Sequence, residues 1–190
     1  MPKLGAEPIR REALVKATIA EIGATGSLDV TVARIAKRAG MSSALAHHYF
    51  GGKEDIFLAA MRHTLTVYGA EVRGALAMAT GPRDRLEAIV RASFSTSNFR
   101  KETIASWLNF YVLAQKSDSA ARLLTIYRRR LRSNLLHELR PLAGDAAEAI
   151  AERLAALIDG LYLRVSLRDD LENGDEATAL ALGLIERELR

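Results

Sequence analysis

Apolar side chains recur at every third or fourth position through most of the chain, and this spacing constrains the fold more than any other feature. One such stripe comprises Phe57, Met61, Leu65, Tyr68, Val72 and Leu76. Similar stripes run through residues 124–139 and 150–165. This spacing places side chains on one face of a helix, whereas a half-buried strand needs alternation at every second residue. Such alternation is sustained nowhere, so we predict an all-α fold.

Glycine and proline residues divide the chain into about nine helices. Gly23 and Gly26 are predicted to end a first helix that begins near Pro8, and Gly40 to end a second that begins near Thr31. Further breaks are predicted at 51–52, 81–82, 98–101, 117–119, 141–145 and 172–175. Three short helices would then occupy the first fifty residues. We therefore expect an N-terminal domain over residues 1–52 and a C-terminal domain over residues 53–190.

The net charge of +4 comes entirely from the N-terminal quarter of the 190-residue chain. Residues 1–53 contain eight Lys and Arg against four Asp and Glu, which leaves nineteen of each kind in residues 54–190. A local excess of basic side chains favours an anionic partner. Nucleic acid is the first candidate and an anionic membrane surface the second.

Several classes of function are excluded by missing residues. The chain has no cysteine, which excludes disulfides, thiolate zinc sites and cysteine nucleophiles. It has no GxSxG or GxGxxG motif, and Glu54 follows Lys53 where a P-loop needs Ser or Thr. His63 and His137 are isolated on predicted helices. We therefore predict a protein that is not an enzyme and holds no metal or cofactor.

The opening residues lack the apolar centre of a signal peptide, and no apolar run is long enough to span a bilayer. A cytoplasmic protein is therefore expected.

Residues 31–50, TVARIAKRAGMSSALAHHYF, have the form of a helix-turn-helix motif. Ile35 would lie on the apolar face of the first helix, Gly40 permits a tight turn, and Ser42 or Ser43 can cap the second helix. The short side chains that follow would let this helix enter a DNA major groove. A helical hairpin inside a bundle, with the basic residues as a solvated face, is the structural alternative.

Residues around this motif also suit DNA. Thr31, at the start of a helix with free backbone amides, suits a phosphate oxygen, and Lys53 could hold the flanking backbone by its charge. Tyr49 could pack its ring and direct its hydroxyl to a phosphate. His47 and His48 point about 100° apart on a helix, and no further ligand cluster lies near them in the sequence, so we expect no metal site there.

Aromatic residues are concentrated in one stretch, which contains Phe94, Phe99, Trp107, Phe110, Tyr111 and Tyr127. Trp107, Phe110 and Tyr111 share a helix face, and aromatic faces are the preferred partners of a quaternary ammonium ion. Asp159 interrupts the apolar run ALIDGLYL and would add a negative charge, with Tyr162 one turn later. Core packing is the alternative for the aromatic face, and a backbone or arginine partner is the alternative for Asp159.

Two further features belong to the C-terminal part. The arginines of residues 128–132 spread around a helix, so we interpret them as surface charge or as partners of acids such as Glu138. The last two helices, over about 145–168 and 175–190, are apolar on more than one face, and Gly160 would permit close approach. We assign them to a dimer interface in the form of a four-helix bundle.

Two segments, RREALVKATIAEIGATG and TVARIAKRAGMSSALAHHYFGGKEDIFLAAM, resemble the DNA-binding domain of the TetR family of bacterial repressors over residues 8–61. MPKLG, ASWLNFYVLAQ, RRRLRSNLL and AALIDGLYLR are similar to the choline-responsive members of that family, which repress genes of glycine betaine synthesis. The resemblance implies a homodimer on double-stranded operator DNA, with recognition helices at 42–48 in successive major grooves about 34–36 Å apart. It also implies release or weakening on DNA by choline.

By position, the resemblance implies a DNA-facing set of Thr31, Ser42, Ser43, Ala44, His47, His48, Tyr49 and Lys53. The wider family usually has an aromatic residue where His47 stands, which leaves the base contacts from this position open. The predicted effector-binding set is Trp107, Phe110, Tyr111, Tyr127, Asp159 and Tyr162. Betaine aldehyde or betaine are alternative effectors. The alternative function is a repressor of other genes that responds to a different cationic or apolar molecule.

Overall fold

The computed structural model describes residues 6–166 and 174–190, which form nine α-helices and no β-strand. The helices are α1 (Ala6–Thr25), α2 (Val32–Arg38), α3 (Ser43–Phe50), α4 (Lys53–Met78), α5 (Gly81–Ser93), α6 (Lys101–Leu113), α7 (Asp118–Ala143), α8 (Ala147–Ser166) and α9 (Asp175–Glu188). A short 3-10 helix, η1 (Gly144–Ala146), joins α7 to α8. The predicted all-α fold is confirmed. No helix in these residues is apolar over a stretch long enough to cross a membrane.

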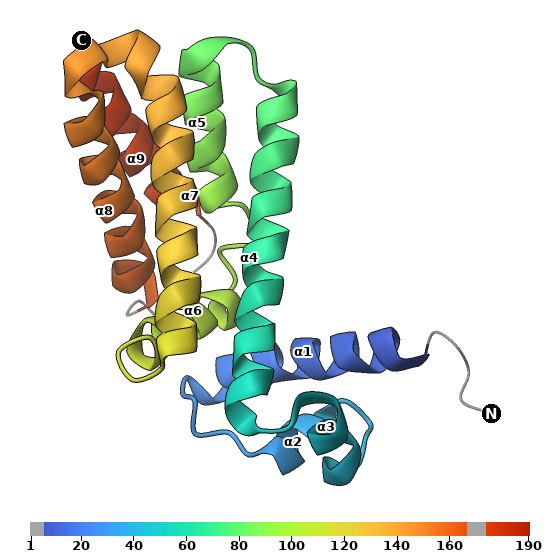
Figure 1. The fold of residues 1–190 in the computed structure, drawn as a ribbon. Coiled ribbons are helices and arrows are strands. Elements are labelled where there is room, and N and C mark those ends of the chain that lie inside the picture. The colour runs from blue at the N-terminus through green and yellow to red at the C-terminus, as the bar shows by residue number, and fades with distance from the viewer. Residues whose placement is uncertain (1–5, 167–173) are drawn as a thin grey trace.

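The helices form a tall bundle above a small head, which consists of α1, α2 and α3 (Figure 1). Helices α4, α5, α7, α8 and α9 run along the length of the bundle, and α6 lies at its lower end. Helix α1 crosses beneath the bundle, with α2 and α3 below it. Helix α4 begins in the head and continues upward into the bundle, so it connects the two parts mechanically.

Two hydrophobic clusters fill the interior. The cluster in the head includes Leu14, Ile35 and Phe57, and the larger cluster of the bundle begins at Leu58. The two clusters therefore meet inside α4, between adjacent residues. Burial of apolar surface on both sides of this point holds α4 in both parts, since each large buried side chain contributes about 1.5–3 kcal/mol.

The apolar stripes read from the sequence face these clusters. In α7 every member of the predicted stripe is buried, namely Leu124, Tyr127, Leu131, Leu135 and Leu139. In α8 the buried members include Ile150, Leu154, Ile158 and Leu161, while Val165 lies outside the side chains that the structure describes.

Most helix boundaries follow the predicted breaks, with corrections in α1 and at Pro141, which lies inside the last turn of α7 rather than in a break. Gly26 (φ 64°) follows the end of α1, but Gly23 lies inside that helix, which is 20 residues long and not short. A glycine is needed at this position of α1 because α6 packs directly against it. Gly40 (φ 69°) follows α2 as predicted. The predicted break at 172–175 falls partly outside the described residues, and α9 begins at Asp175.

Helix α6 crosses α1 at Gly23. A Cβ atom added there would lie 2.7 Å from Cα of Glu102, so only a glycine allows this approach. On the same side of α6, Nδ2 of Asn109 donates a hydrogen bond to the carbonyl oxygen of Gly26 at 3.2 Å. Near the start of α4, the Ser117 hydroxyl donates to Oε1 of Glu54 at 2.5 Å. The head is thus fixed to the bundle through α6 and the α7 N-terminus as well as through α4.

Candidate functional site

Helices α2 and α3 form the helix-turn-helix expected from the sequence. The Thr31 hydroxyl caps α2 by accepting a hydrogen bond from the Arg34 amide, and the Ser42 hydroxyl caps α3 by accepting one from the Leu45 amide, both at 3.2 Å. Ser42, rather than Ser43, is therefore the N-cap. Helix α3 continues to Phe50, two residues beyond the predicted recognition helix.

Helix α1 fixes the C-terminal end of α3. The Arg11 guanidinium donates a hydrogen bond to the carbonyl oxygen of Tyr49 at 2.5 Å and lies 4.4 Å from the centroid of the Phe50 ring. Arg10 donates to the Tyr49 hydroxyl at 3.3 Å. Tyr49 is half-buried, so its ring packs while its hydroxyl stays at the surface beside a basic side chain.

A buried carboxylate fixes α2 on α1. Glu21, only 5 % exposed, pairs with Arg34 at 2.9 Å and with Arg38. The hydrogen bond from Arg38 is the main reason why the pKa of Glu21 is lowered, against the opposing effect of burial. Arg34 and Arg38 therefore lie partly on the structural side of α2 and do not form a purely solvated face.

The predicted DNA-facing residues are accessible at the surface of the head. Apart from half-buried Tyr49, all are exposed, namely Thr31, Ser42, Ser43, Ala44, His47, His48 and Lys53. Nδ1 of His47 lies 2.8 Å from the carbonyl oxygen of Gly51, so this ring also caps the end of α3. The Lys53 ammonium lies 5.5 Å from the centroid of the Phe57 ring.

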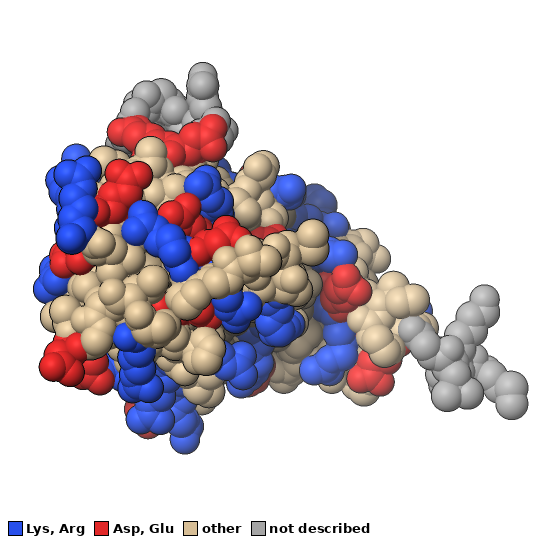
Figure 2. Space-filling view, turned by 90° about the horizontal axis from the view of Figure 1, so that it is seen from above, with Lys and Arg blue, Asp and Glu red and all other residues tan. Residues whose placement is uncertain are grey.

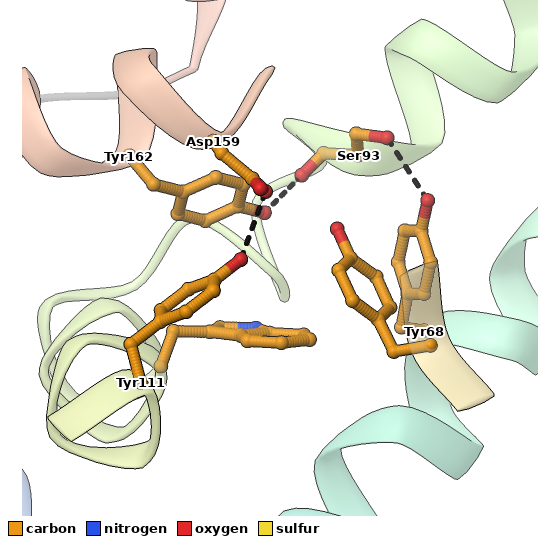
Figure 3. Close-up of a pocket in the computed structure, with 7 residues that line it drawn as sticks. Tyr68, Ser93, Tyr111, Asp159 and Tyr162 are labelled. Atoms are coloured by element: carbon orange, nitrogen blue, oxygen red, sulfur yellow. Dashed lines mark hydrogen bonds between the residues drawn. The ribbon is translucent and has the colours of Figure 1, made fainter. Parts of the chain in front are cut away.

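The second candidate site is a pocket inside the bundle, where five helices converge (Figure 3). Its lining residues come from α4, α5, α6, α7 and α8 and are Tyr68, Ser93, Trp107, Tyr111, Tyr127, Asp159 and Tyr162. The aromatic rings lie close together, with 4.6 Å between the centroids of Trp107 and Tyr127 and 6.2 Å between those of Trp107 and Tyr111.

Hydrogen bonds connect the polar groups of this pocket. The Tyr111 hydroxyl donates to Oδ1 of Asp159 at 2.9 Å, and Figure 3 shows both groups pointing toward each other. The Tyr68 hydroxyl lies 3.1 Å from Oγ of Ser93, and the Tyr162 hydroxyl donates to the Ser93 carbonyl oxygen. The pocket volume is only about 10 Å³, which is room for about one water molecule.

Among the described residues that line the pocket, Asp159 is the one carboxylic acid, and none is basic. Burial raises the pKa of Asp159, while the Tyr111 hydrogen bond and the Arg128 charge act in the opposite direction. Burial also raises the pKa of Tyr68 to about 12 and that of Tyr111 further, so these phenols remain neutral. An ionised Asp159 therefore gives this aromatic pocket a single negative charge.

The structure brings together five of the six predicted effector residues. Phe110 is the exception, because it is 1 % exposed and packs in the core beside Trp107, with 6.3 Å between ring centroids. Tyr68 and Ser93 were not predicted. A hydroxyl-bearing residue within the apolar stripe of α4 was a signal for Tyr68, whereas nothing in the sequence distinguished Ser93 from other serines.

The arginines of residues 128–132 are exposed surface charges, and Arg132 forms intramolecular ion pairs, as predicted, but Glu138 is not among their partners. Glu138 pairs with Arg85 of α5 at 2.9 Å, so the prediction that it pairs with this cluster is wrong. Arg132 instead bridges to Glu148 and Glu152 of α8, at 3.2 Å each. Seen from above in Figure 2, basic and acidic side chains are interspersed over the surface of the bundle.

Comparison with known proteins identifies the class. Residues 14–60 match the family model of bacterial regulatory proteins of the tetR family, and residues 82–190 match that of the BetI-type transcriptional repressor C-terminal domain. The chain belongs to the TetR family of DNA-binding transcriptional regulators, and it is a transcriptional repressor rather than an enzyme.

Curated proteins similar to this chain over most of its length share one name. The HTH-type transcriptional regulator BetI of Brucella anthropi is 52 % identical over 95 % of this chain and 93 % of its own length. The regulator of the same name from Agrobacterium fabrum is 54 % identical over 88 % of this chain and 82 % of its own.

Solved structures share the fold. A putative transcriptional regulator from Pseudomonas aeruginosa PAO1 has a TM-score of 0.79 at 27 % identity, covering 99 % of this chain and 97 % of that one. Another, from Saccharomonospora viridis and solved in complex with choline, has a TM-score of 0.85 at 23 % identity, covering 94 % and 96 %. The latter identity supports a common fold alone.

Proposed function

We propose that this chain is a homodimeric repressor of the genes that convert choline to glycine betaine, and that choline weakens its hold on operator DNA. The observation that carries the proposal is the half-buried Asp159 carboxylate in a pocket walled by Trp107 and four tyrosines. The names of the BetI relatives and the choline complex of the Saccharomonospora regulator support the same ligand.

The chemistry of the pocket suits a quaternary ammonium alcohol. A trimethylammonium group has no hydrogen to donate, so it is bound by aromatic ring faces and by a nearby negative charge. Trp107, Tyr111 and Tyr127 supply the rings, and Asp159 supplies the charge. Across the pocket from Tyr111, the Tyr68 and Ser93 hydroxyls offer partners for the hydroxyl of choline (Figure 3).

On the DNA side, we propose that the exposed set on α3 and its neighbours contacts the operator, with residues 1–52 as the DNA-binding domain and residues 53–190 as the effector and dimerisation domain. Ser42, Ser43 and Ala44 at the start of α3 are small enough to approach base edges. Lys53 would hold a phosphate.

The dimer interface is proposed on α8 and α9. At Gly160 of α8 and Gly183 of α9, an added Cβ atom would meet no other atom within 4 Å, and Leu180 of α9 is 48 % exposed. Small residues leave room for close approach of a partner helix, and an exposed leucine favours burial. Two copies of α8 and α9 would then form a four-helix bundle.

Helices α4 and α6 connect the pocket to the DNA-binding head, so we propose that they transmit the effect of the ligand. Tyr68 lies on α4, whose first residue is Lys53 in the head, and Tyr111 lies on α6, which packs against α1 at Gly23. A ligand that separates these helices would shift the head and change the distance between the two recognition helices of a dimer. It acts only through its different affinities for the two arrangements.

Calorimetric titration with choline tests the ligand directly. We expect saturable binding to the wild-type protein, and a loss of affinity of about tenfold or more in Asp159→Asn, which removes the charge and keeps the shape. Asp145→Asn, an exposed position in η1, is the control and should bind choline like the wild type. Absence of binding to the wild-type protein would contradict the proposal.

A further inference from the structure

Arg128 lies on α7 directly after the pocket residue Tyr127, but its side chain is exposed and lines no part of the pocket. Its guanidinium carbon lies 5.7 Å from the centroid of the Tyr111 ring. The Tyr111 hydroxyl in turn donates to Asp159. A cation, an aromatic ring and a carboxylate thus follow one another from the surface to the interior.

The Arg128 charge is not neutralised by a direct ion pair with an acid of residues 6–166 or 174–190. Its influence reaches the pocket, because it lowers the pKa of both Asp159 and Tyr111 against the effect of burial. Among the described basic residues, Arg128 is the one with this effect on Asp159.

The pocket is closed in this arrangement. A volume of about 10 Å³ holds about one water molecule and cannot hold a trimethylammonium group. The Tyr111 hydroxyl bonds Oδ1 of Asp159 in this closed pocket, so side chains of the lining, Tyr111 among them, have to move before a trimethylammonium group fits beside the carboxylate. Arg128 lies against the ring that has to move.

We propose that Arg128 is a specificity-determining residue of this pocket, a resident cation that balances Asp159 while the pocket is closed and opposes the binding of a cationic effector. This inference rests on the proposed function. When choline enters, its ammonium group takes over the role of counter-charge to Asp159 at shorter range. The repulsion from Arg128 reduces the affinity for choline, so the repressor responds only at a higher choline concentration.

Loss of the Arg128 charge should affect a charged and an uncharged ligand of equal shape differently. 3,3-Dimethyl-1-butanol has a carbon atom where choline has its nitrogen, so it is uncharged. Replacement of Arg128 should therefore change the affinity for choline and leave the affinity for the butanol unchanged. A purely structural role of Arg128 in packing against Tyr111 would change both affinities alike.

The test compares Arg128→Gln with Arg129→Gln in the full-length protein, by calorimetric titration with each of the two ligands. Arg129 is the matched control, since it is exposed on α7, has no ion pair within the described residues and loses the same charge. We expect Arg128→Gln to bind choline about three- to tenfold more tightly than Arg129→Gln, with equal affinities for the butanol.

Three results would overturn the role of Arg128: equal choline affinities in the two variants, a parallel change for both ligands, or weaker choline binding in Arg128→Gln. Each of these leaves the proposed function standing, because choline still binds. A wild-type protein that binds no choline would instead overturn the proposed function together with this inference.

Discussion

Gly23 of α1 lies directly against Glu102 of α6, and a Cβ atom at this glycine would come within 2.7 Å of the Glu102 Cα atom. Side-chain rotation of Glu102 cannot relieve this contact, because a backbone atom is involved. Helix α6 carries Trp107 and Tyr111 further along its length. The helix that walls the pocket is therefore in contact with the first helix of the DNA-binding head.

Gly23→Ala should destabilise the protein, although alanine is the better helix former. The added methyl group must push α1 and α6 apart, and we expect the free energy of unfolding to fall by about 1–3 kcal/mol. Gly74→Ala is the matched control, because Gly74 is exposed in α4 with no atom near its Cβ position, and a gain of up to about 1 kcal/mol is expected there. Urea denaturation measures both changes. If Gly23→Ala is as stable as Gly74→Ala, the close contact does not exist.

Lys53→Ala should weaken operator binding without affecting choline binding. A lysine that neutralises one phosphate contributes about one counterion to the salt dependence, so the slope of log Kd against log salt should decrease by about one for each bound protomer. Arg130→Ala, an exposed position on α7 in the bundle, is the control and should leave the slope unchanged. Anisotropy titrations at several salt concentrations measure the slope. An identical slope in both variants would remove Lys53 from the DNA surface.

The helices were predictable from the sequence because their determinants are local. The stripe in α7 and the caps at Thr31 and Ser42 each depend on residues within a few positions of one another. Gly23 was misinterpreted for the opposite reason. From the sequence alone, a glycine predicts a helix end unless the residue that packs against it is known. For Gly23 that residue is Glu102, which is 79 positions away.

The pocket was partly predictable for the same reason. Trp107 and Tyr111 share a face of one helix, and Asp159 is conspicuous in an apolar run. The helical spacing did not distinguish the residues of α6 that line the pocket from those that pack in the core. Phe110, predicted to bind the effector, belongs to the core. Ser93 contributes its hydroxyl only because α5 ends beside α4 and α8, which is a tertiary property.

Tyr68→Phe should weaken the binding of the choline hydroxyl without affecting the binding of the ammonium group. This change removes the hydroxyl that faces Ser93 and retains the ring. If the alcohol of choline binds here, its affinity should fall by about two- to tenfold, the value of one neutral hydrogen bond. Tetramethylammonium lacks the alcohol, so its affinity should not change. Calorimetric competition measures both, and an equal loss for the two ligands would place the choline hydroxyl elsewhere.

The affinity for choline should increase with pH through the titration of Asp159. Burial raises the pKa of this carboxyl, and the cation binds its ionised form, so binding strengthens as the pH rises through that pKa and is constant above it. Among the described residues, Tyr68, Tyr111, Tyr127 and Tyr162 line the pocket with this carboxyl, and their raised pKa values keep them neutral. Arg128 acts on the carboxyl from outside the pocket.

Titrations from about pH 4, near the ordinary pKa of an aspartate, up to about pH 8 cover the direction of this shift. Asp159→Asn should show a weak affinity that does not vary with pH over this range. A pH dependence that persists in Asp159→Asn would assign the titration to another group.

Fluorescence anisotropy of a labelled duplex from upstream of betaine-synthesis genes tests the central claim most directly, with protein added in the presence and absence of choline. We predict tight, salt-dependent binding whose Kd rises by about 5- to 150-fold with saturating choline, the usual range of coupling between two sites. Asp159→Asn should bind the same duplex equally well and show no response. A wild-type Kd for this duplex that saturating choline leaves unchanged would contradict a choline-responsive repressor.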